Sequence, residues 1–321
     1  MIAPVDKSRQ ASGRNDEARG PDCEAIARAA GLERSRVEYV DEIGSTNLEL
    51  MSRPAAPDAL EPLVLISGRQ SAGRGRRGRV WLGSAPDSLA MSICMHRARR
   101  GAPVPLTGLP IALGAAIAAT VTPCSRGIGL KWPNDLLRDA RKCAGMLIET
   151  RTVGELERVV VGLGLNWRMP PALARSLADI AAGATPAPGT PHCDGDGDDG
   201  DGDRTAPLSA PPAGGLFDEL PEPALRERIT GELAASIIEC TRRFFELGFA
   251  DTAARWARFD VLAGREVAIV LDAQRAFCGR AEGLDRDGAL RVRTAGGIVP
   301  VAAGDVSVRF LADARPAGVS R

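Results

Sequence analysis

Aromatic residues and histidine are scarce in this chain of 321 residues. Phe, Trp and Tyr together make up 4% of the sequence, and the two histidines are His96 and His192. His96 follows an apolar run and His192 lies in a low-complexity stretch, so neither belongs to a pattern for Ser-His-Asp or Cys-His catalysis. We therefore expect both histidines to be structural and the chemistry to proceed without a histidine base.

The chain also lacks an excess of charge and a cysteine pattern. Basic and acidic residues both number 41, which argues against a protein built mainly to bind nucleic acid. Seven scattered cysteines form no Cys-x-x-Cys pair. Reduced thiols in a cytosolic protein fit this usage better than a disulfide framework or a zinc site does.

Long hydrophobic runs are missing as well. Residues 1–20 are polar and charged, unlike a signal peptide. The longest apolar run, Leu106–Val121, is short for a bilayer and is interrupted by Gly108, Pro110 and Gly114. We expect a buried helix there, in a cytoplasmic protein that does not enter a membrane.

Against this background, one run rich in arginine and glycine stands out. Residues 73–79 hold four arginines and three glycines, and Trp81 follows. Glycines let the backbone fold tightly around a ligand, and arginines supply permanently charged donors for phosphate or carboxylate. Two further runs, Lys-Trp-Pro-Asn-Asp at 131–135 and Arg-Lys-Cys-Ala-Gly at 141–145, add cations and a carboxylate. Each run alone is equally typical of a solvated loop, but their combination indicates a site for a phosphorylated anion.

The hydrophobic pattern predicts an α/β (α+β) fold. Strands are expected at Val37–Ile43, Leu63–Gly68, Ser88–Met95, Gly129–Trp132, Cys143–Thr150 and Glu157–Trp167, and helices at Leu106–Thr122 and Pro223–Phe249. Glycines alternate at positions 162 and 164 within the last of these strands. Glycine inside a strand often marks the close approach of a ligand or of another backbone.

The remaining segments differ in composition. Residues 1–35 are expected to be a disordered or helical extension. Residues 24–37, at its end, look like part of a helix-turn-helix but are interpreted as one amphipathic helix that leads into a strand. An Asp/Gly/Pro-rich insertion at 183–215 is expected to be disordered because of its polar, low-complexity composition. Calcium binding is the less favoured alternative, because the glutamate that an EF-hand loop needs is missing. Five short strands after Gly264 predict a small barrel.

Taken in order, these runs resemble the biotin protein ligases. The resemblance extends from Gly44 to Arg309 and rests on the runs at 44–47, 70–79, 131–135, 141–145 and 162–166. It implies a class II aminoacyl-tRNA synthetase-like catalytic domain over residues 36–262 and an SH3-like C-terminal β-barrel over 263–312. It also implies formation of biotinyl-5′-AMP from biotin and ATP with Mg²⁺. Biotin would then pass to a lysine of the biotin carboxyl carrier protein of acetyl-CoA carboxylase.

The resemblance implies roles for individual residues as well. Biotin would be bound by Ser45, Thr46, Asn47, Gln70, Gly73, Arg74, Arg76, Lys142, Gly145, Gly162 and Gly164. ATP and the adenylate would be bound by Arg76, Arg77, Arg79, Trp81, Lys131, Asn134, Lys142 and Asn166. Arg76 and Lys142 would offset negative charge during catalysis, and Asp135 would receive the acceptor lysine. No protein ligand for a metal is expected.

Two alternative functions remain open at this point. A lipoate–protein ligase or octanoyltransferase would share the superfamily, and a nucleic-acid-binding module would use the arginine run and the small barrel. Many bacterial biotin protein ligases carry an N-terminal winged helix that represses genes, and the residues before Gly44 leave no room for one. We therefore expect a monofunctional ligase that does not bind DNA, with homodimer formation left open.

Overall fold

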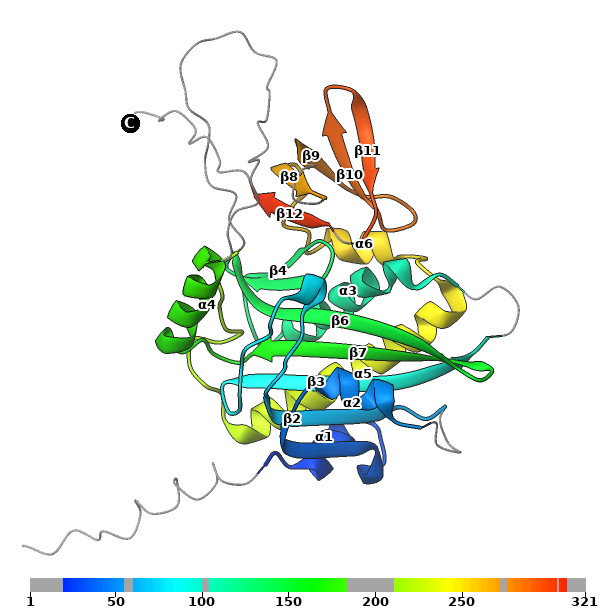
Figure 1. Ribbon diagram of the computed structural model, residues 1–321, viewed down its shortest axis with the longest axis vertical. Helices are drawn as coiled ribbons and strands as arrows, with labels where there is room; N and C mark the ends of the chain where they lie inside the picture. The colour runs from blue at the N-terminus through cyan, green and yellow to red at the C-terminus, as the bar shows by residue number, and fades with distance from the viewer. Residues whose placement is uncertain are drawn as a thin grey trace, which may run out of the picture.

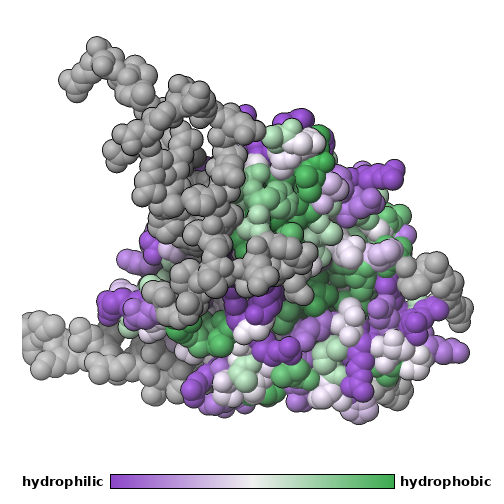
Figure 2. Space-filling view, turned by 45° about the horizontal axis from the view of Figure 1, so that its top comes forward, coloured by the Kyte–Doolittle hydropathy of each residue, from purple (hydrophilic) through white to green (hydrophobic). Residues whose placement is uncertain are grey.

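The computed structural model describes residues 20–54, 60–99, 104–183, 211–271, 276–304 and 306–310. These residues form a mixed α/β protein with a large sheet built before residue 167 and a small sheet built after residue 265 (Figure 1). Within these ranges, no helix is both long and apolar enough to cross a bilayer. Figure 2 shows hydrophilic and hydrophobic residues interspersed over one face, as is usual where a protein surface contacts water.

The large sheet has seven strands in the order β1-β2-β3-β7-β6-β5-β4. β1 and β2 run parallel, and the other neighbouring pairs are antiparallel. The strands span Val37–Ile43 (β1), Leu63–Gln70 (β2), Ser88–Ala98 (β3), Ile128–Lys131 (β4), Asp135–Arg138 (β5), Arg141–Val153 (β6) and Leu156–Asn166 (β7). The long strands β3, β7 and β6 lie side by side and form the rigid middle of the sheet.

Helices cover both faces of this sheet (Figure 1). They span Cys23–Ala30 (α1), Thr46–Ser52 (α2), Leu109–Val121 (α3), Pro171–Gly183 (α4), Pro223–Leu247 (α5) and Thr252–Ala257 (α6). Successive residues of a strand point to opposite faces. Val64 and Ile66 of β2 accordingly pack into the main core with α1, α3 and α5, whereas Leu65 packs with α2.

The small sheet is antiparallel and has the order β11-β10-β9-β8-β12. Its strands span Glu266–Val270 (β8), Ala276–Leu284 (β9), Leu290–Thr294 (β10), Gly297–Val301 (β11) and Ser307–Phe310 (β12). Trp132, which is buried, donates from Nε1 to the carbonyl oxygen of Gly288 at 3.1 Å. This bond, and a hydrophobic core that is continuous between the two sheets, hold the small sheet against the large one.

The predicted elements are present, with small differences at their ends. β1 has the predicted bounds, and the helix expected from Leu106 begins with a 3₁₀ turn and becomes α-helical at Leu109. The sequence pattern does not predict α2, α4 or β5. α2 is only seven residues long, and β5 begins directly after a Trp-Pro-Asn turn, so neither shows a clear period.

Parts of two expected segments lie outside the described residues, namely 1–19 and 184–210, and the disorder expected there stays a prediction. The end of the expected insertion, residues 211–215, is described and is hydrogen-bonded to the large sheet. The backbone N–H of Lys142 donates to the carbonyl oxygen of Pro212 at 2.8 Å, and that of Gly214 donates to the carbonyl oxygen of Lys142 at 2.8 Å. These last residues therefore belong to the folded body.

Most of the described cysteines carry free thiols, and His96 takes part in a hydrogen bond away from the pocket. Free thiols are present at Cys23, Cys94, Cys124, Cys143 and Cys240. Cys278 is disulfide-bonded, which corrects the expectation of reduced cysteines at that position. His96 accepts a hydrogen bond from Nε of Arg158 at 3.0 Å, outside the site described below.

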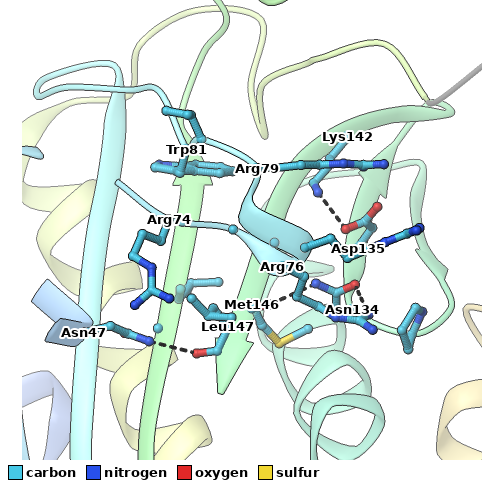
Figure 3. Close-up of a pocket in the computed structure, with 18 of the residues that line it drawn as sticks. Asn47, Arg74, Arg76, Arg79, Trp81, Asn134, Asp135, Lys142, Met146 and Leu147 are labelled. Carbon is cyan, nitrogen blue, oxygen red and sulfur yellow. Dashed lines mark hydrogen bonds and ion pairs between the residues drawn. The ribbon is translucent and has the colours of Figure 1, made fainter. Parts of the chain in front are cut away.

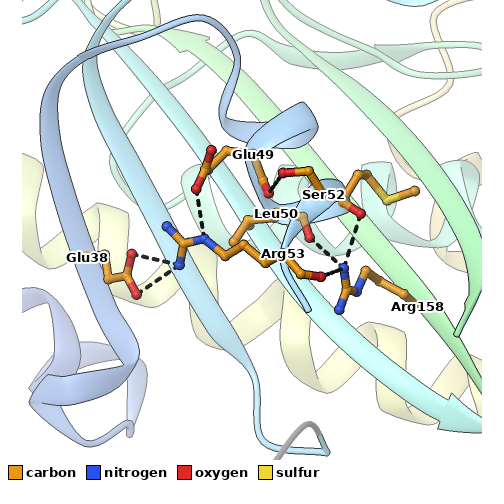
Figure 4. A network of polar contacts seen from close by, with 7 residues as sticks. Glu38, Glu49, Leu50, Ser52, Arg53 and Arg158 are labelled. Carbon is orange, nitrogen blue, oxygen red and sulfur yellow. Dashed lines mark hydrogen bonds and ion pairs between the residues drawn. The ribbon is translucent and has the colours of Figure 1, made fainter. Parts of the chain in front are cut away.

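Arg158 lies on β7 and holds α2 in place (Figure 4). Its side chain is 2% exposed, and its Nη1 donates to the carbonyl oxygens of Leu50, Met51 and Arg53 at 3.1, 3.1 and 2.5 Å. Carbonyl groups at the end of a helix have no partner within it. The guanidinium therefore caps α2, whose other end reaches the pocket described below.

Replacing Arg158 with methionine should lower the free energy of unfolding by about 2–4 kcal/mol, because three part-buried carbonyls lose their donor. Chemical denaturation followed by circular dichroism measures the change. Arg151→Ala is the control, since the exposed Arg151 approaches the Met51 carbonyl at 3.5 Å. It should cost less than about 0.5 kcal/mol. Equal losses in the two variants would show that Arg158 does not act as the cap.

Candidate active site

A pocket lies where the two sheets meet (Figure 3). Its lining comes from β3, β6 and β7, the start of α2, the loop of residues 74–81, the β4–β5 turn and residues 306–309. Segments that are far apart in the sequence therefore converge on one cavity. All three charged runs that the sequence singles out contribute to it.

Positive charge is concentrated in this pocket. Among the described residues, one acidic side chain lines it, Asp135, against seven basic ones, although the whole chain has no net charge. The basic side chains are those of Arg74, Arg76, Arg77, Arg79, Lys131, Lys142 and Arg309. Such a surplus in a partly enclosed site favours a ligand with several negative charges.

Another part of the lining is apolar. It includes Trp81, Ala90, Met91, Met146, Leu147 and Leu163. A site with an apolar part and a few placed polar groups suits an organic molecule, and the cationic part suits its phosphate or carboxylate groups. The pocket can thus hold an amphipathic ligand together with a polyanion.

A lysine–aspartate ion pair lies in the β5–β6 hairpin (Figure 3). Lys142 Nζ is 2.7 Å from Asp135 Oδ1, and the register between β5 and β6 shifts next to Lys142, a β-bulge of the kind that re-aims side chains. Burial alone would raise the pKa of Asp135. The ammonium groups of Lys142 and Lys131 outweigh burial, so the pKa is lowered and the carboxylate is ionised at neutral pH.

Lys131 is the most deeply buried cation of the pocket, with 5% of its surface exposed. Burial lowers the pKa of Lys131 to about 8; Asp135 opposes this shift, and the charges of Arg309, Lys142 and Arg79 add to it. Burial and the neighbouring arginines also lower the pKa of Arg309. A bound anion would offset this repulsion among the cations.

A chain of hydrogen bonds supports the start of α2. Gln70 Oε1 accepts from the backbone N–H of Thr46 at 2.9 Å, and Thr46 Oγ1 lies 2.6 Å from Ser92 Oγ. Ser92 Oγ donates to Asn47 Oδ1 at 2.6 Å, and Asn47 Nδ2 donates to the carbonyl oxygen of Leu147 at 3.2 Å. The chain links β2, α2, β3 and β6, so it fixes the polar groups on this side of the pocket.

The alternating glycines of β7 are explained by side chains that lie against them. A Cβ atom at Gly162 would come within 2.3 Å of Asn47 Oδ1, and one at Gly164 within 2.4 Å of Trp81 Cε2. The atoms next to these glycines belong to side chains of the pocket itself and to neither a ligand nor another backbone, and the close approach of a ligand stays a prediction.

Arg76 connects three parts of the site. Its Nη1 donates to Asn134 Oδ1 at 3.0 Å, and its Nη2 donates to the carbonyl oxygen of Gly304 next to the small sheet. Asn134 is held in turn, because its Nδ2 donates to the carbonyl oxygen of Met146 at 2.9 Å. The loop of residues 74–81, hereafter the arginine loop, is thus tied to the β4–β5 turn and to the C-terminal region.

The structure places nearly every residue of the two binding sets in the lining of this pocket. The exceptions are Gly73 and Asn166. A Cβ atom at Gly73 would meet the Trp81 carbonyl oxygen at 2.4 Å. Asn166 is buried and donates from Nδ2 to the carbonyl oxygen of Gly214 at 3.2 Å. Both residues therefore lie where they support the pocket from behind, and their direct contacts with a ligand stay predictions.

Sequence reasoning missed Ser92, Glu149 and Arg309. Ser92 and Arg309 line the pocket, and Glu149 pairs with Arg74 at 3.0 Å. The sequence does contain a signal for Ser92, since a hydroxyl within the apolar run of residues 89–95 needs a polar partner. It contains no such signal for Glu149 and Arg309, because only the tertiary structure brings them to the site.

Two family models match the chain. The model for the biotin/lipoate A/B protein ligase family matches residues 45–166, and the model for the biotin protein ligase C terminal domain matches residues 263–309. Together they account for more than half of the chain. The chain belongs to the biotin protein ligase family. The two matches fall on the large and the small sheet, and the pocket lies between these sheets.

Individual relatives agree with this assignment. A biotin–[acetyl-CoA-carboxylase] ligase from Mycobacterium tuberculosis is 31% identical over 86% of this chain and 90% of its own length. The bifunctional ligase/repressor BirA of Escherichia coli is 28% identical over 87% of this chain and 75% of its own length. A biotin protein ligase structure from Aquifex aeolicus with biotin and ATP has a TM-score of 0.62, with 21% identity over 86% of this chain and 99% of that one. This structural likeness concerns the fold.

The lowered pKa of Lys131 predicts that ATP binding takes up protons near pH 8. About half of the Lys131 side chains are neutral at that pH, and phosphate groups should return them to the charged form. Calorimetric titrations in buffers of different ionisation enthalpy measure the uptake. The difference between the wild type and Lys131→Met should be about half a proton at pH 8. It should be close to zero at pH 6.5, where Lys131 is already protonated. No difference at either pH would contradict the assignment.

Proposed function

We propose that this chain is an ATP-dependent biotin–protein ligase that uses the pocket for both half-reactions. Biotin and ATP first give biotinyl-5′-AMP and pyrophosphate, and biotin then passes to a lysine of a biotin carboxyl carrier protein. The observation that carries the proposal is the joining of an apolar surface to seven basic side chains in one cavity. Such a cavity suits an apolar acid that must react with a nucleotide.

The first half-reaction brings two anions together. A carboxylate oxygen of biotin forms a bond to the α-phosphorus of ATP, and the bond from that phosphorus to pyrophosphate breaks. Fixed cations in a site shielded from water reduce the repulsion between the reactants and stabilise the charge that grows in the transition state. We assign this role to Lys142 and Arg76, with Lys131, Arg77 and Arg79 on the phosphates.

Magnesium would enter with the nucleotide. Among the described residues, no three His, Cys, Asp or Glu side chains gather into a metal site. From this described part of the chain, the pocket offers the carboxylate of Asp135, which is already paired with Lys142. Mg²⁺ commonly binds through substrate phosphates and water and takes few ligands from the protein. The residues present therefore fit Mg²⁺ that is carried by the phosphates of ATP.

In the second half-reaction, the acceptor amine forms a bond to the biotinyl carbonyl carbon, and the bond from that carbon to AMP breaks. The acceptor ammonium must first lose a proton. We assign to Asp135, whose lowered pKa keeps it negative, the binding of this ammonium and assistance to its deprotonation, and the proton passes on to solvent. Cys143 follows Lys142, but burial raises the pKa of its thiol to about 12, so it is not the nucleophile of a covalent intermediate.

The finer architecture follows the resemblance. We propose a class II aminoacyl-tRNA synthetase-like catalytic domain over residues 36–262 and an SH3-like barrel over 263–312. The large mixed sheet and the small five-stranded antiparallel sheet support this division. The mycobacterial relative is named for its action on acetyl-CoA carboxylase, and the carrier protein of that carboxylase is the proposed acceptor. A cytoplasmic location would suit this acceptor.

A lipoate–protein ligase is the second candidate, because the model for residues 45–166 covers both kinds of ligase. The model for residues 263–309 names biotin protein ligases alone, which favours biotin. Pyrophosphate exchange with ATP, measured with biotin and with lipoate, separates the two. Exchange that depends on lipoate and not on biotin would overturn the proposal.

Lys142→Ala should slow biotin-dependent pyrophosphate exchange by about 10²–10³, because it removes a placed cation from the transition state. Lys142→Arg should recover only part of this loss, since a planar fork positions its donors differently from an ammonium. Arg151→Ala, which removes an exposed cation of the same strand, should exchange at the normal rate. Near-normal exchange by a folded Lys142→Ala enzyme would remove Lys142 from the catalytic set.

Asp135→Asn should harm transfer to the carrier more than it harms adenylate formation, because the acceptor amine takes part only in the second step. Single-turnover rates of the two steps, started from biotin plus ATP and from purified biotinyl-5′-AMP, give the comparison. Asp139→Asn is the control in the same hairpin, where the residue has a φ of 48° that asparagine tolerates. Equal losses in both steps would assign Asp135 to ATP or metal binding.

A further inference from the structure

Glu149 is an acidic residue beside the pocket for which the mechanism above has no use. It lies on β6, on the side of the strand that faces α2 and the arginine loop, and its side chain is 22% exposed. A carboxylate next to a site that must attract anions works against that attraction. Its presence there calls for a structural account.

Both oxygens of this carboxylate are engaged. Oε1 accepts from Arg74 Nη1 at 3.0 Å, and Oε2 accepts from Asn47 Nδ2 at 2.9 Å. Arg74 belongs to the arginine loop, whereas Asn47 belongs to α2, and Figure 3 shows the two side chains on the same side of the pocket. Glu149 therefore bridges the loop and the helix from the strand between them.

The direction of the hydrogen bonds makes Glu149 hard to replace. Asn47 Oδ1 is occupied by the Ser92 hydroxyl, and Asn47 Nδ2 also donates to the Leu147 carbonyl. Its amide thus presents a donor to Glu149, as does the guanidinium of Arg74. A group that accepts on both sides is required, and a carboxylate is the side chain that meets this need. Glutamine would turn one N–H group toward another donor.

We infer that Glu149 is a positioning residue that holds the arginine loop against the sheet through Arg74. With this contact present, the loop is fastened near its start by Glu149 and further along by the bond from Arg76 to Asn134. Loss of the first contact leaves the start of the loop without this fastening, and Arg76, through Asn134 and the Gly304 carbonyl, and Trp81, against Gly164, still hold the rest of it. Glu149 thereby sets how often the loop opens.

Opening of the loop should release the adenylate, an expectation that rests on the proposed function. Biotinyl-5′-AMP is a mixed anhydride that water hydrolyses, and a loop that closes over it protects it until the carrier arrives. A looser loop should release more adenylate in each turnover. Glu149 would then act on the fate of the intermediate and leave its formation largely unchanged.

Limited digestion with trypsin tests the positioning role without any substrate. The loop contains Arg74, Arg76, Arg77 and Arg79, and cleavage after arginine requires that it open. Glu149→Gln neither adds nor removes a trypsin site, and it should raise the initial rate of cleavage after Arg77 and Arg79 by about threefold to tenfold. Because the contact is half-exposed, this ratio should shrink in 1 M salt.

Glu157→Gln is the matched control. Glu157 lies on the neighbouring strand β7, is 21% exposed and pairs with Arg97 at 2.6 Å, outside the pocket lining. Its loss should leave cleavage of the loop unchanged. Arg74→Gln should accelerate cleavage after Arg77 as Glu149→Gln does, and the double variant should add little, because both changes remove the same contact. Wild-type cleavage in Glu149→Gln, or equal acceleration in Glu157→Gln, would overturn the inference.

A second measurement connects the loop to the reaction. Biotin and radiolabelled ATP are mixed with enzyme in the absence of carrier, and free biotinyl-5′-AMP plus AMP is quantified after rapid filtration. Glu149→Gln should release intermediate about threefold to tenfold faster, with a nearly normal rate of adenylate formation. If trypsin cleaves Glu149→Gln faster but the wild type forms no adenylate, the proposed function is refuted and the positioning role is retained. Normal release together with faster cleavage would refute the link between the loop and the intermediate.

Discussion

The constraint on which this structure depends is the gathering of like charges in one partly buried place. Of the side chains that the structure describes, seven basic ones and one carboxylate line the cavity, in a chain whose total charge is zero. Repulsion and burial show in the pKa of Lys131, which falls to about 8. Such an arrangement holds only where a rigid frame fixes the cations, and here the frame is the large sheet with its hairpins and the start of α2.

That frame depends on small residues and on fully used hydrogen bonds. Gly162 and Gly164 leave room for Asn47 and Trp81, which would collide with any side chain at these positions. Ser92, buried among apolar neighbours, connects Thr46 with Asn47. The polar groups of the pocket are therefore oriented before a ligand binds, which lowers the reorganisation that the reaction requires.

The small sheet takes part in the site. Trp132 bonds to Gly288, Arg76 reaches the carbonyl of Gly304, and Arg309 adds a cation to the lining. The side chain of Lys131 also lies 6.0 Å from the centre of the Phe310 ring. Lys131, at the end of β4, and Trp132, at the start of the β4–β5 turn, thus both contact the C-terminal region. This explains why the two matched family regions act on one pocket although about a hundred residues separate them.

Local sequence patterns specify the composition of the site and most of the sheet. Arginines between glycines, the Lys-Trp-Pro-Asn-Asp run and the glycines of β7 each carry a local chemical signal, and local periodicity predicts long strands well. The tertiary structure alone decides that Lys142 pairs with Asp135, that Glu149 contacts Arg74 and Asn47, and that Arg309 lines the pocket. These depend on strand register and on packing between distant segments, which no local pattern encodes. The short elements α2 and β5 were missed for the same reason, because packing and pairing hold them in place and intrinsic propensity contributes little.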